Sequence, residues 1–325
     1  MQPNETTPAI VIEALSKEYR LQSGQAKTAV NRLNLAIPRG QICGFLGTNG
    51  AGKTTTIKML CGLILPSQGR ALVNGYDVSH EHRQTMRHIG VVLEGARNIY
   101  WRLSAFENLL YFGHLKGCHG ATLRKRAGQL LHELDLWDRR DQAVRTFSRG
   151  MQQKVAIACA LIADPPIVLL DEPTLGLDVQ AAQTVKAWIA RLCREQGKTI
   201  VLTTHQLEIV EALCERVAIM QQGHLIADEP LDRLLEQFQK RSYQITLQGP
   251  LTPEQVSAFA PLRVSSAGSM SVISRDQADQ ASLYHTLTLI EHMGLSLRAV
   301  QYGEPSLEEV FLGLMQQAER QKIHG

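Results

Sequence analysis

The stretch FLGTNGAGKTTTIKMLCG, residues 45–62, contains the densest cluster of glycines in the chain. From Gly47 to Thr54 it matches the pattern G-x-x-x-x-G-K-[ST]. Glycines let the backbone curl so that its N–H groups point inward at phosphate oxygens, and the helix that follows contributes its positive end. Lys53 is placed to reach the outer phosphates, and the Thr54 hydroxyl is placed to ligate Mg²⁺. The stretch therefore predicts a nucleotide-phosphate site at a strand-to-helix turn.

Polar side chains also end two later apolar runs. IVLLDE, residues 167–172, ends in Asp171 and Glu172, and TIVLTTH, residues 199–205, ends in His205. Both runs have the Val/Ile/Leu composition of buried parallel strands, whose carboxyl ends form the ligand-binding edge of α/β proteins. At that edge one acid can hold Mg²⁺ while the other orients and deprotonates a water, and the histidine can contact the outermost phosphate. We therefore expect these side chains beside the phosphate site.

Composition is that of a globular protein of about two domains. Of the 325 residues 44% are apolar and 20% are charged, and the formal net charge is +3. The longest apolar run, residues 155–163, is much shorter than the roughly 20 residues that span a bilayer, and the first ten residues do not resemble a signal peptide. The six cysteines form no C-x-x-C pair, so we expect reduced thiols, with neither a disulfide framework nor a zinc site.

The segment TFSRGMQQKVAIACALIADPPIVLLDEPTLGLD, residues 146–178, stands between the glycine loop and the TTH of residues 203–205. It resembles the signature helix, Walker B strand and D-loop of ATP-binding cassette (ABC) proteins, and the similarity extends over residues 10–235. This resemblance implies an α/β fold: a P-loop NTPase core with an N-terminal antiparallel β subdomain and a helical subdomain inserted at about residues 95–163.

The resemblance also implies ATP and Mg²⁺ as cofactors. It makes Glu172 the catalytic base, with His205 as the switch histidine and Lys53 as a third catalytic residue. Thr54, Asp171 and Glu94 are the expected Mg²⁺ ligands. In this family an aromatic ring stacks on adenine, and the resemblance assigns that role to Tyr19. Ser148 and Gly150 would contact nucleotide bound by a second chain. The expected nucleotide contacts are Tyr19, Gly47, Asn49, Gly50, Ala51, Gly52, Lys53, Thr54, Thr55, Ser148, Gly150 and Asp178.

Two positions depart from the family pattern. Where the family signature is usually Leu-Ser-Gly-Gly-Gln, residues 147–151 read FSRGM, so that Arg149 replaces a glycine while Ser148 and Gly150 are kept. Ser148 suits the N-cap of the following helix. Glu94 stands where the family usually has glutamine; a carboxylate can ligate Mg²⁺, but an unpaired one would be repelled by ATP.

One chain carries one phosphate loop and one signature, so the resemblance implies a dimer, by default a homodimer, that closes around two ATP molecules. It implies an ATP-hydrolysing subunit that drives a separate membrane permease for export, bound at the cytoplasmic face of the cell membrane. A permease helix would dock in a groove beside Glu94, lined by Tyr100, Trp101 and Phe106, although these aromatic residues could equally belong to the core.

The alternative is a soluble cassette ATPase that acts on ribosomes or nucleic acid. Such relatives usually have two cassettes or a coiled-coil insert, which this sequence lacks. The basic residues 124–126, Arg139 and Arg140 alternate with acids, which is typical of a solvated face. We therefore expect no nucleic-acid partner.

Residues 240–318 are expected to form a separate accessory or regulatory domain. Their strand and helix patterns alternate as β-α-β-β-α-β, the order of a ferredoxin-like α+β module, with a hairpin around Gly268. A capping box from Thr252 to Gln255 is predicted to open the first helix. The cassette is assigned to residues 10–235, and residues 1–9 are expected to be a flexible start.

Overall fold

A computed structural model describes residues 7–20, 24–95, 98–237, 242–267, 270–275, 280–303 and 307–324. The chain divides into two compact units, one made of the residues up to Leu231 together with those from Ala318 onward, and the other made of Asp232–Gln317. The division falls slightly before the predicted cassette end at Leu235. The grouping of the last residues with the first unit was not predicted.

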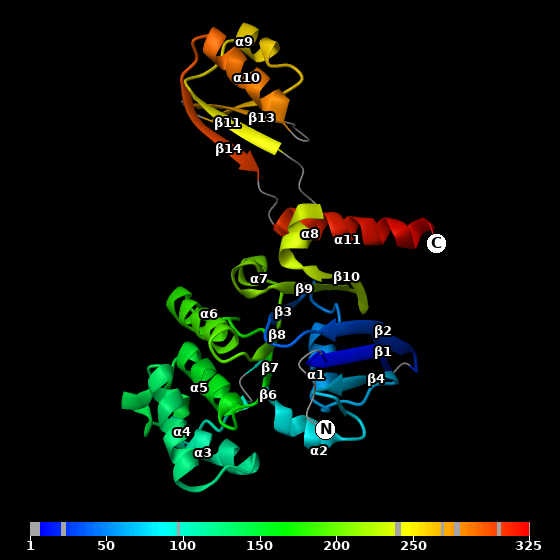
Figure 1. Cartoon of the computed structure of the whole chain (residues 1–325), viewed down its shortest axis with the longest axis vertical. Helices are drawn as coiled ribbons and strands as arrows, with labels where there is room; N and C mark the ends of the chain where they lie inside the picture. Colours follow the sequence, from blue (N-terminus) through cyan, green and yellow to red (C-terminus); the bar gives the residue numbers. More distant parts are fainter. Residues whose placement is uncertain are drawn as a thin grey trace. The chain divides into compact units, whose positions relative to one another are not determined.

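A six-stranded sheet forms the centre of the first unit, in the order β10-β9-β3-β8-β7-β6 (Figure 1). All neighbouring pairs are parallel except β10 with β9. Three of the four inner strands, β3, β7 and β8, are buried along their whole length, as their continuous apolar composition predicts. The bounds are β3 (Ile42–Leu46), β6 (Ile89–Val92), β7 (Ile167–Asp171), β8 (Thr199–Thr204), β9 (Arg216–Gln221) and β10 (His224–Pro230).

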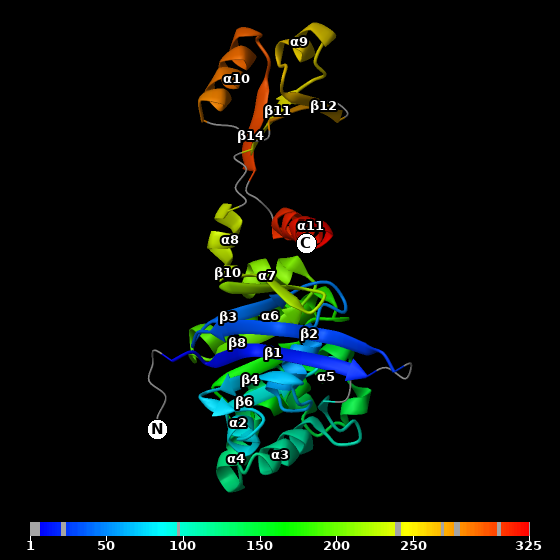
Figure 2. The ribbon, with the colours of Figure 1, turned by 90° about the vertical axis from the view of Figure 1, so that its right-hand side faces the viewer.

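An antiparallel sheet in the order β2-β1-β4-β5 lies beside the central sheet (Figure 2). Helix α1 packs against β2 and β4 of this sheet and against β7 of the central one. Apolar residues from both sheets and α1 share one buried cluster, so the N-terminal strands are part of the same core. The bounds are β1 (Ile10–Arg20), β2 (Ala26–Ile37), α1 (Lys53–Leu60), β4 (Gln68–Val73) and β5 (Tyr76–Asp77).

Helices lie in the crossover connections between the parallel strands of the central sheet. Helix α5 packs on β6, while α6 and α7 pack on β8 and α7 also contacts β3. Helices α3, α4 and α5 contact one another and form the predicted helical insertion (Figure 1). The bounds are α2 (His82–His88), α3 (Ala105–Leu115), α4 (Gly120–Glu133), η2 (Trp137–Arg139), η3 (Val144–Thr146), α5 (Arg149–Leu161), α6 (Val179–Arg194), α7 (Leu207–Leu213) and α8 (Leu231–Gln237).

The second unit is built on an antiparallel sheet in the order β12-β13-β11-β14. The elements follow one another as β-α-β-β-α-β, the predicted order, and Thr252 and Gln255 form the predicted capping box at α9. Its own core contains Tyr243, Ile245 and Phe259. The bounds are β11 (Ser242–Gln248), α9 (Pro253–Ala258), β12 (Arg263–Ala267), β13 (Met270–Arg275), α10 (Gln280–His292), β14 (Leu297–Gly303) and α11 (Leu307–His324).

Three details bear on the sequence-based expectations. Residues 1–6 of the expected flexible start, and Gly268 of the expected hairpin, lie outside the described residues. Ala9, which was assigned to that start, is instead fully buried, and its N–H donates to the Ile37 carbonyl at 2.8 Å. This bond lies directly before the first residue pair of the β1–β2 ladder, Ile10 with Ile37.

All six cysteines are free thiols. Burial raises the pKa of Cys43 and of Cys61 to about 12, so both stay protonated at neutral pH. Within the described ranges, no helix is both long and apolar enough to cross a bilayer.

Candidate functional site

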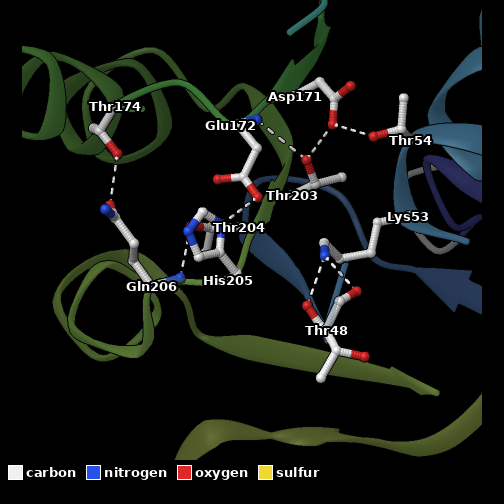
Figure 3. A network of polar contacts seen from close by, with 11 residues as sticks. Thr48, Lys53, Thr54, Asp171, Glu172, Thr174, Thr203, Thr204, His205 and Gln206 are labelled. Carbon is white, nitrogen blue, oxygen red and sulfur yellow. Dashed lines mark hydrogen bonds and ion pairs between the residues drawn. The ribbon is translucent and has the colours of Figure 1, made fainter. Parts of the chain in front are cut away.

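The candidate site lies where parallel strands of the central sheet end. The glycine loop follows β3, Glu94 follows β6, Asp171 ends β7, and His205 follows β8. Because these strands are parallel neighbours, their carboxyl ends meet at one edge of the sheet. Figure 3 shows that Lys53, Asp171, Glu172 and His205 converge there from three segments far apart in the sequence.

The glycine loop needs glycine for two separate reasons. Gly52 precedes α1 and has a φ of 107°, a left-handed value that residues with a Cβ rarely adopt. At Gly47 the obstacle is space, because an added Cβ would collide with the carbonyl oxygen of Met220 on β9. Backbone conformation at one glycine and close packing at the other therefore fix the loop against the sheet.

Lys53 is buried, and its ammonium group turns back onto the loop. Its Nζ donates to the carbonyl oxygens of Gly47 at 2.6 Å and Thr48 at 3.2 Å (Figure 3). Burial lowers the pKa of Lys53, and the acids Glu172, Asp171 and Glu94 oppose that shift. These three carboxylates thus help to keep a desolvated cation charged at the sheet edge.

Asp171 is 1% exposed, and within the described residues only one of its two carboxylate oxygens accepts hydrogen bonds. Oδ1 accepts hydrogen bonds from the Thr54 hydroxyl, at 3.1 Å, and from the Thr203 hydroxyl. Oδ2 is buried and has no hydrogen-bond partner among the described residues. A buried anionic oxygen without a donor is costly, so this atom fits a cation ligand.

The described part of the chain does not form a metal site from protein ligands alone. Among the described residues, no group of three or more His, Cys, Asp or Glu side chains could hold a metal ion. Mg²⁺ usually binds one or two protein oxygens together with phosphates and water. The donor set of Asp171 Oδ2 and the Thr54 hydroxyl fits such a nucleotide-associated ion.

Glu172 and His205 form a close pair. His205 Nδ1 lies 2.8 Å from Glu172 Oε1, and the Glu172 side chain is 8% exposed whereas that of His205 is 41% exposed. Glu172 has a φ of 49° and is therefore left-handed, although it is not a glycine. A carboxylate that is largely shielded from solvent and oriented by an imidazole has the geometry of a general base.

One pocket of about 480 Å³ gathers most of the predicted nucleotide contacts. Its lining includes the side chain of Tyr19, the glycine loop, and the acids Glu94 and Glu172. Tyr19 is 38% exposed, and the Lys17 ammonium lies 5.4 Å from the centre of its ring. The pocket is lined by Tyr19, Lys27, Thr28, Ala29, Asn49, Gly50, Ala51, Gly52, Lys53, Thr54, Thr55, Glu94 and Glu172.

Ser148, Gly150 and Asp178 lie apart from this pocket, since none is among the described residues that line it. Ser148 caps α5 as predicted, accepting from the Met151 N–H, and Asp178 caps α6, accepting from the Ala181 N–H at 2.8 Å. A Cβ on Gly150 would lie 2.6 Å from the Ala181 Cβ, so the beginnings of α5 and α6 are packed together. The signature and D-loop therefore form a second, separate group within the chain.

Two of the three predicted groove aromatics are exposed side chains, not core. Tyr100 is 49% exposed and Trp101 is 48% exposed, while Phe106 is partly buried. Trp101 lines a pocket of about 430 Å³ with Glu94 and Arg149. Tyr100 and Phe106 do not line that pocket among the described residues.

Thr203, which was not among the predicted site residues, contacts both acids. Its hydroxyl donates to Asp171, and its carbonyl accepts from the Glu172 N–H at 3.1 Å. The signal was present, because Thr203 stands two residues before His205 in a strand already predicted to end at the site. What was missing was the pairing of β8 with β7, which brings Thr203 opposite Asp171.

Comparison with known proteins gives the family. Residues 30–175 match the model of the "ABC transporter" family, and residues 242–301 match a "Domain of unknown function (DUF8691)". The chain is 32% identical over 315 residues to the daunorubicin/doxorubicin resistance ATP-binding protein DrrA of Streptomyces peucetius, covering 95% of this chain and 93% of that protein. It is 35% identical to the Nod factor export ATP-binding protein I of Ralstonia nicotianae, covering 95% and 94%.

Solved structures of ABC cassettes have the same fold as the first unit. The ATP-binding cassette MJ0796, solved as a dimer in a post-hydrolysis state bound to ADP and Pi, superposes with a TM-score of 0.63 at 27% identity, covering 68% of this chain and 98% of that one. The structure of an ATP binding subunit of an ABC transporter superposes with a TM-score of 0.63 at 31% identity, covering 71% and 93%. The chain belongs to the family of ABC transporter ATP-binding proteins.

Proposed function

We propose that this protein is the ATP-hydrolysing subunit of an exporter whose membrane-spanning part is a separate permease. The family is one of transporter ATPases, and relatives similar over nearly the whole chain are described as a drug-resistance protein and a Nod factor exporter. The observation that carries the proposal is the convergence of the glycine loop, Asp171, Glu172 and His205 at one sheet edge (Figure 3).

The loop residues bind the nucleotide in this account. The backbone N–H groups from Asn49 to Thr55 surround the phosphates, and Tyr19 stacks on the base. The Lys53 ammonium exchanges its hydrogen bonds to the loop carbonyls for hydrogen bonds to the outer phosphates. The Lys53 ammonium has a short distance to travel, because its present acceptors belong to the same loop.

Asp171 Oδ2 and the Thr54 hydroxyl would hold Mg²⁺, with Glu94 facing the same pocket. When bound, the ion neutralises charge on the β- and γ-phosphate oxygens.

Glu172 takes the proton from the attacking water. His205 holds the Glu172 carboxylate through the 2.8 Å contact and can donate to the outermost phosphate once that contact exchanges. General-base catalysis of this kind contributes about 10²- to 10⁴-fold to a rate.

Two chains are needed for one complete site. Ser148 and Gly150 lie outside the nucleotide pocket of their own chain, so they would meet the phosphate bound by a second copy. The positive end of α5 would then face that phosphate. We take the dimer to be a homodimer that sits on the permease at the cytoplasmic face of the membrane.

The test is a pull-down of tagged Glu172→Gln chain from its native cells with ATP and Mg²⁺ present, compared with the wild-type chain. Recovery of a polytopic membrane protein with the variant supports the proposal. Recovery of ribosomal or nucleic-acid partners alone would overturn it. The chain's own basic residues give that alternative little support, because Arg126 pairs with Asp164 and Arg140 pairs with Asp141.

A further inference from the structure

We propose that Thr203 is a positioning residue of the ATPase site, whose single hydroxyl sets both the Mg²⁺-facing oxygen of Asp171 and the backbone of Glu172. The inference rests on the function proposed above. It adds a residue that does not touch nucleotide and acts through the two acids.

Thr203 lies directly opposite Asp171 in the pairing of β8 with β7. Its side chain is fully buried, and Asp171 is 1% exposed, so water does not compete for their hydrogen bond. The Thr203 hydroxyl donates to Asp171 Oδ1. The oxygen of that hydroxyl in turn accepts from the Glu172 N–H at 3.2 Å (Figure 3). The Thr203 carbonyl also accepts from that N–H, at 3.1 Å.

The first consequence concerns the rotation of the Asp171 carboxylate. Oδ1 takes both hydroxyl donors, from Thr54 and Thr203, while Oδ2 is left buried with no partner among the described residues. A carboxylate bound at one oxygen only cannot turn without breaking these bonds. Thr203 therefore helps to hold Oδ2 as the free acceptor, and it would still do so if the Thr54 hydroxyl served as an Mg²⁺ ligand.

The second consequence concerns Glu172. Its φ of 49° is unusual for a residue with a long side chain, and such a conformation persists only where neighbouring groups restrain it. The restraint comes from Thr203, which accepts from the Glu172 N–H with both its carbonyl and its hydroxyl. This conformation directs the Glu172 side chain toward His205, 2.8 Å away.

A purely structural role for Thr203 would require only its size. Valine has the same shape as threonine but no hydroxyl, and serine keeps the hydroxyl but lacks the methyl group. The experiment therefore compares Thr203→Val with Thr203→Ser. Thr199→Val is the matched control, because Thr199 is also a buried threonine of β8 whose hydroxyl bonds to backbone, but at the opposite end of the strand.

Each purified full-length chain is assayed for ATP turnover at saturating ATP while free Mg²⁺ is varied, and for binding of a fluorescent ATP analogue in EDTA. Thr203→Val should raise the Mg²⁺ concentration for half-maximal turnover about tenfold, as loss of an outer-shell partner of a metal ligand typically does. Its maximal turnover should also fall, with binding in EDTA unchanged. Thr203→Ser and Thr199→Val should keep the wild-type Mg²⁺ requirement.

An unchanged Mg²⁺ requirement in Thr203→Val, or an equal rise in Thr203→Val and Thr203→Ser, would overturn the inference while leaving the ATPase intact. A wild-type chain that binds the analogue but hydrolyses no ATP would instead contradict the proposed function. Thr203→Ala, which cannot crowd the site, replaces valine in the same assays if circular dichroism shows that Thr203→Val is unfolded.

Discussion

His205 Nδ1 lies 2.8 Å from Glu172 Oε1, and the two side chains come from neighbouring parallel strands. The contact orients a carboxylate that is 8% exposed with an imidazole that is 41% exposed. The less exposed partner is thus the expected base, and the more exposed partner is free to reach a phosphate.

This pair predicts coupled losses of activity. Glu172→Gln should lower ATP turnover about 10²- to 10⁴-fold while nucleotide binding persists, since the amide cannot accept the proton. His205→Ala should also lower turnover. The double variant should be hardly slower than Glu172→Gln alone, because both residues act on one step. Additive losses in phosphate-release assays of the three variants would show that the pair does not act as a unit.

Two glycines should separate binding from turnover. Gly47→Ala should weaken binding of the ATP analogue in a single chain, because its Cβ would collide with the Met220 carbonyl and displace the loop. Gly150→Ala should leave that binding intact, since its Cβ would press on Ala181 at the beginning of α6. Its turnover should nevertheless fall, because the signature is displaced.

Fluorescence titration and phosphate release, measured on both glycine variants, check this prediction. Gly249→Ala controls for backbone strain alone, because Gly249 has open space around its Cβ position and, unlike Gly47 and Gly150, a positive φ. Loss of nucleotide binding in Gly150→Ala would mean that the signature contributes to the pocket of its own chain.

Glu94 adds a negative charge where the family usually has a neutral amide. Its carboxylate lies in the nucleotide pocket and stabilises the Lys53 ammonium. Glu94→Gln should tighten ATP binding in EDTA severalfold, because repulsion of the phosphates is removed. Binding with saturating Mg²⁺ should change much less. Isothermal titration of both proteins, with and without Mg²⁺, measures the difference, and weaker binding of the variant in EDTA would refute the charge argument.

Asp164 should stabilise the fold in a pH-dependent way. It pairs with Lys198 at 2.7 Å and Arg126 at 3.3 Å. Burial raises the pKa of Asp164, but the hydrogen bond and charge of Lys198 outweigh this effect and hold the pKa below the ordinary 3.8. A lowered carboxylate pKa means that the stabilisation is present above about pH 4 and is lost as the pH falls through the lowered value.

Asp164→Asn should therefore reduce the free energy of unfolding at pH 7 by roughly 1 kcal/mol, since the Asp164 carboxylate is 67% exposed and water screens the pair. The difference from wild type should shrink as the pH falls through the lowered pKa of Asp164, because the wild-type carboxylate is then neutral like the amide of the variant. Urea unfolding at several pH values measures it, with the exposed Asp141→Asn as control. A difference that stays constant with pH would exclude the ion pair as its cause.

The sequence predicted the parts of the site that are local. The glycine loop is one contiguous motif. Asp171 ends β7, Glu172 follows it and His205 follows β8, so the strand ends alone place them at one edge. Thr203 was missed because its role depends on which strand lies beside β7. The free Oδ2 of Asp171 likewise appears only once its neighbours are placed.

Short or polar elements were also missed. Strand β6 has only four residues, and α2, His82–His88, has a single buried residue, so neither presents a clear apolar period. Both depend on packing against neighbouring elements for their stability. Ala9 was likewise assigned to the flexible start. Its backbone bond to Ile37 joins residues far apart in the sequence, so the local sequence does not reveal it.

In the proposed mechanism two chains close around ATP, each completing the other's site. Light scattering coupled to size exclusion measures this closure as a change of mass, on the Glu172→Gln chain with ATP and Mg²⁺ and then with ATP and EDTA. We expect the mass of two chains in the first condition and of one chain in the second, and we expect a Glu172→Gln/Ser148→Arg double variant to stay at the mass of one chain in both. The mass of a single chain under every condition would contradict it.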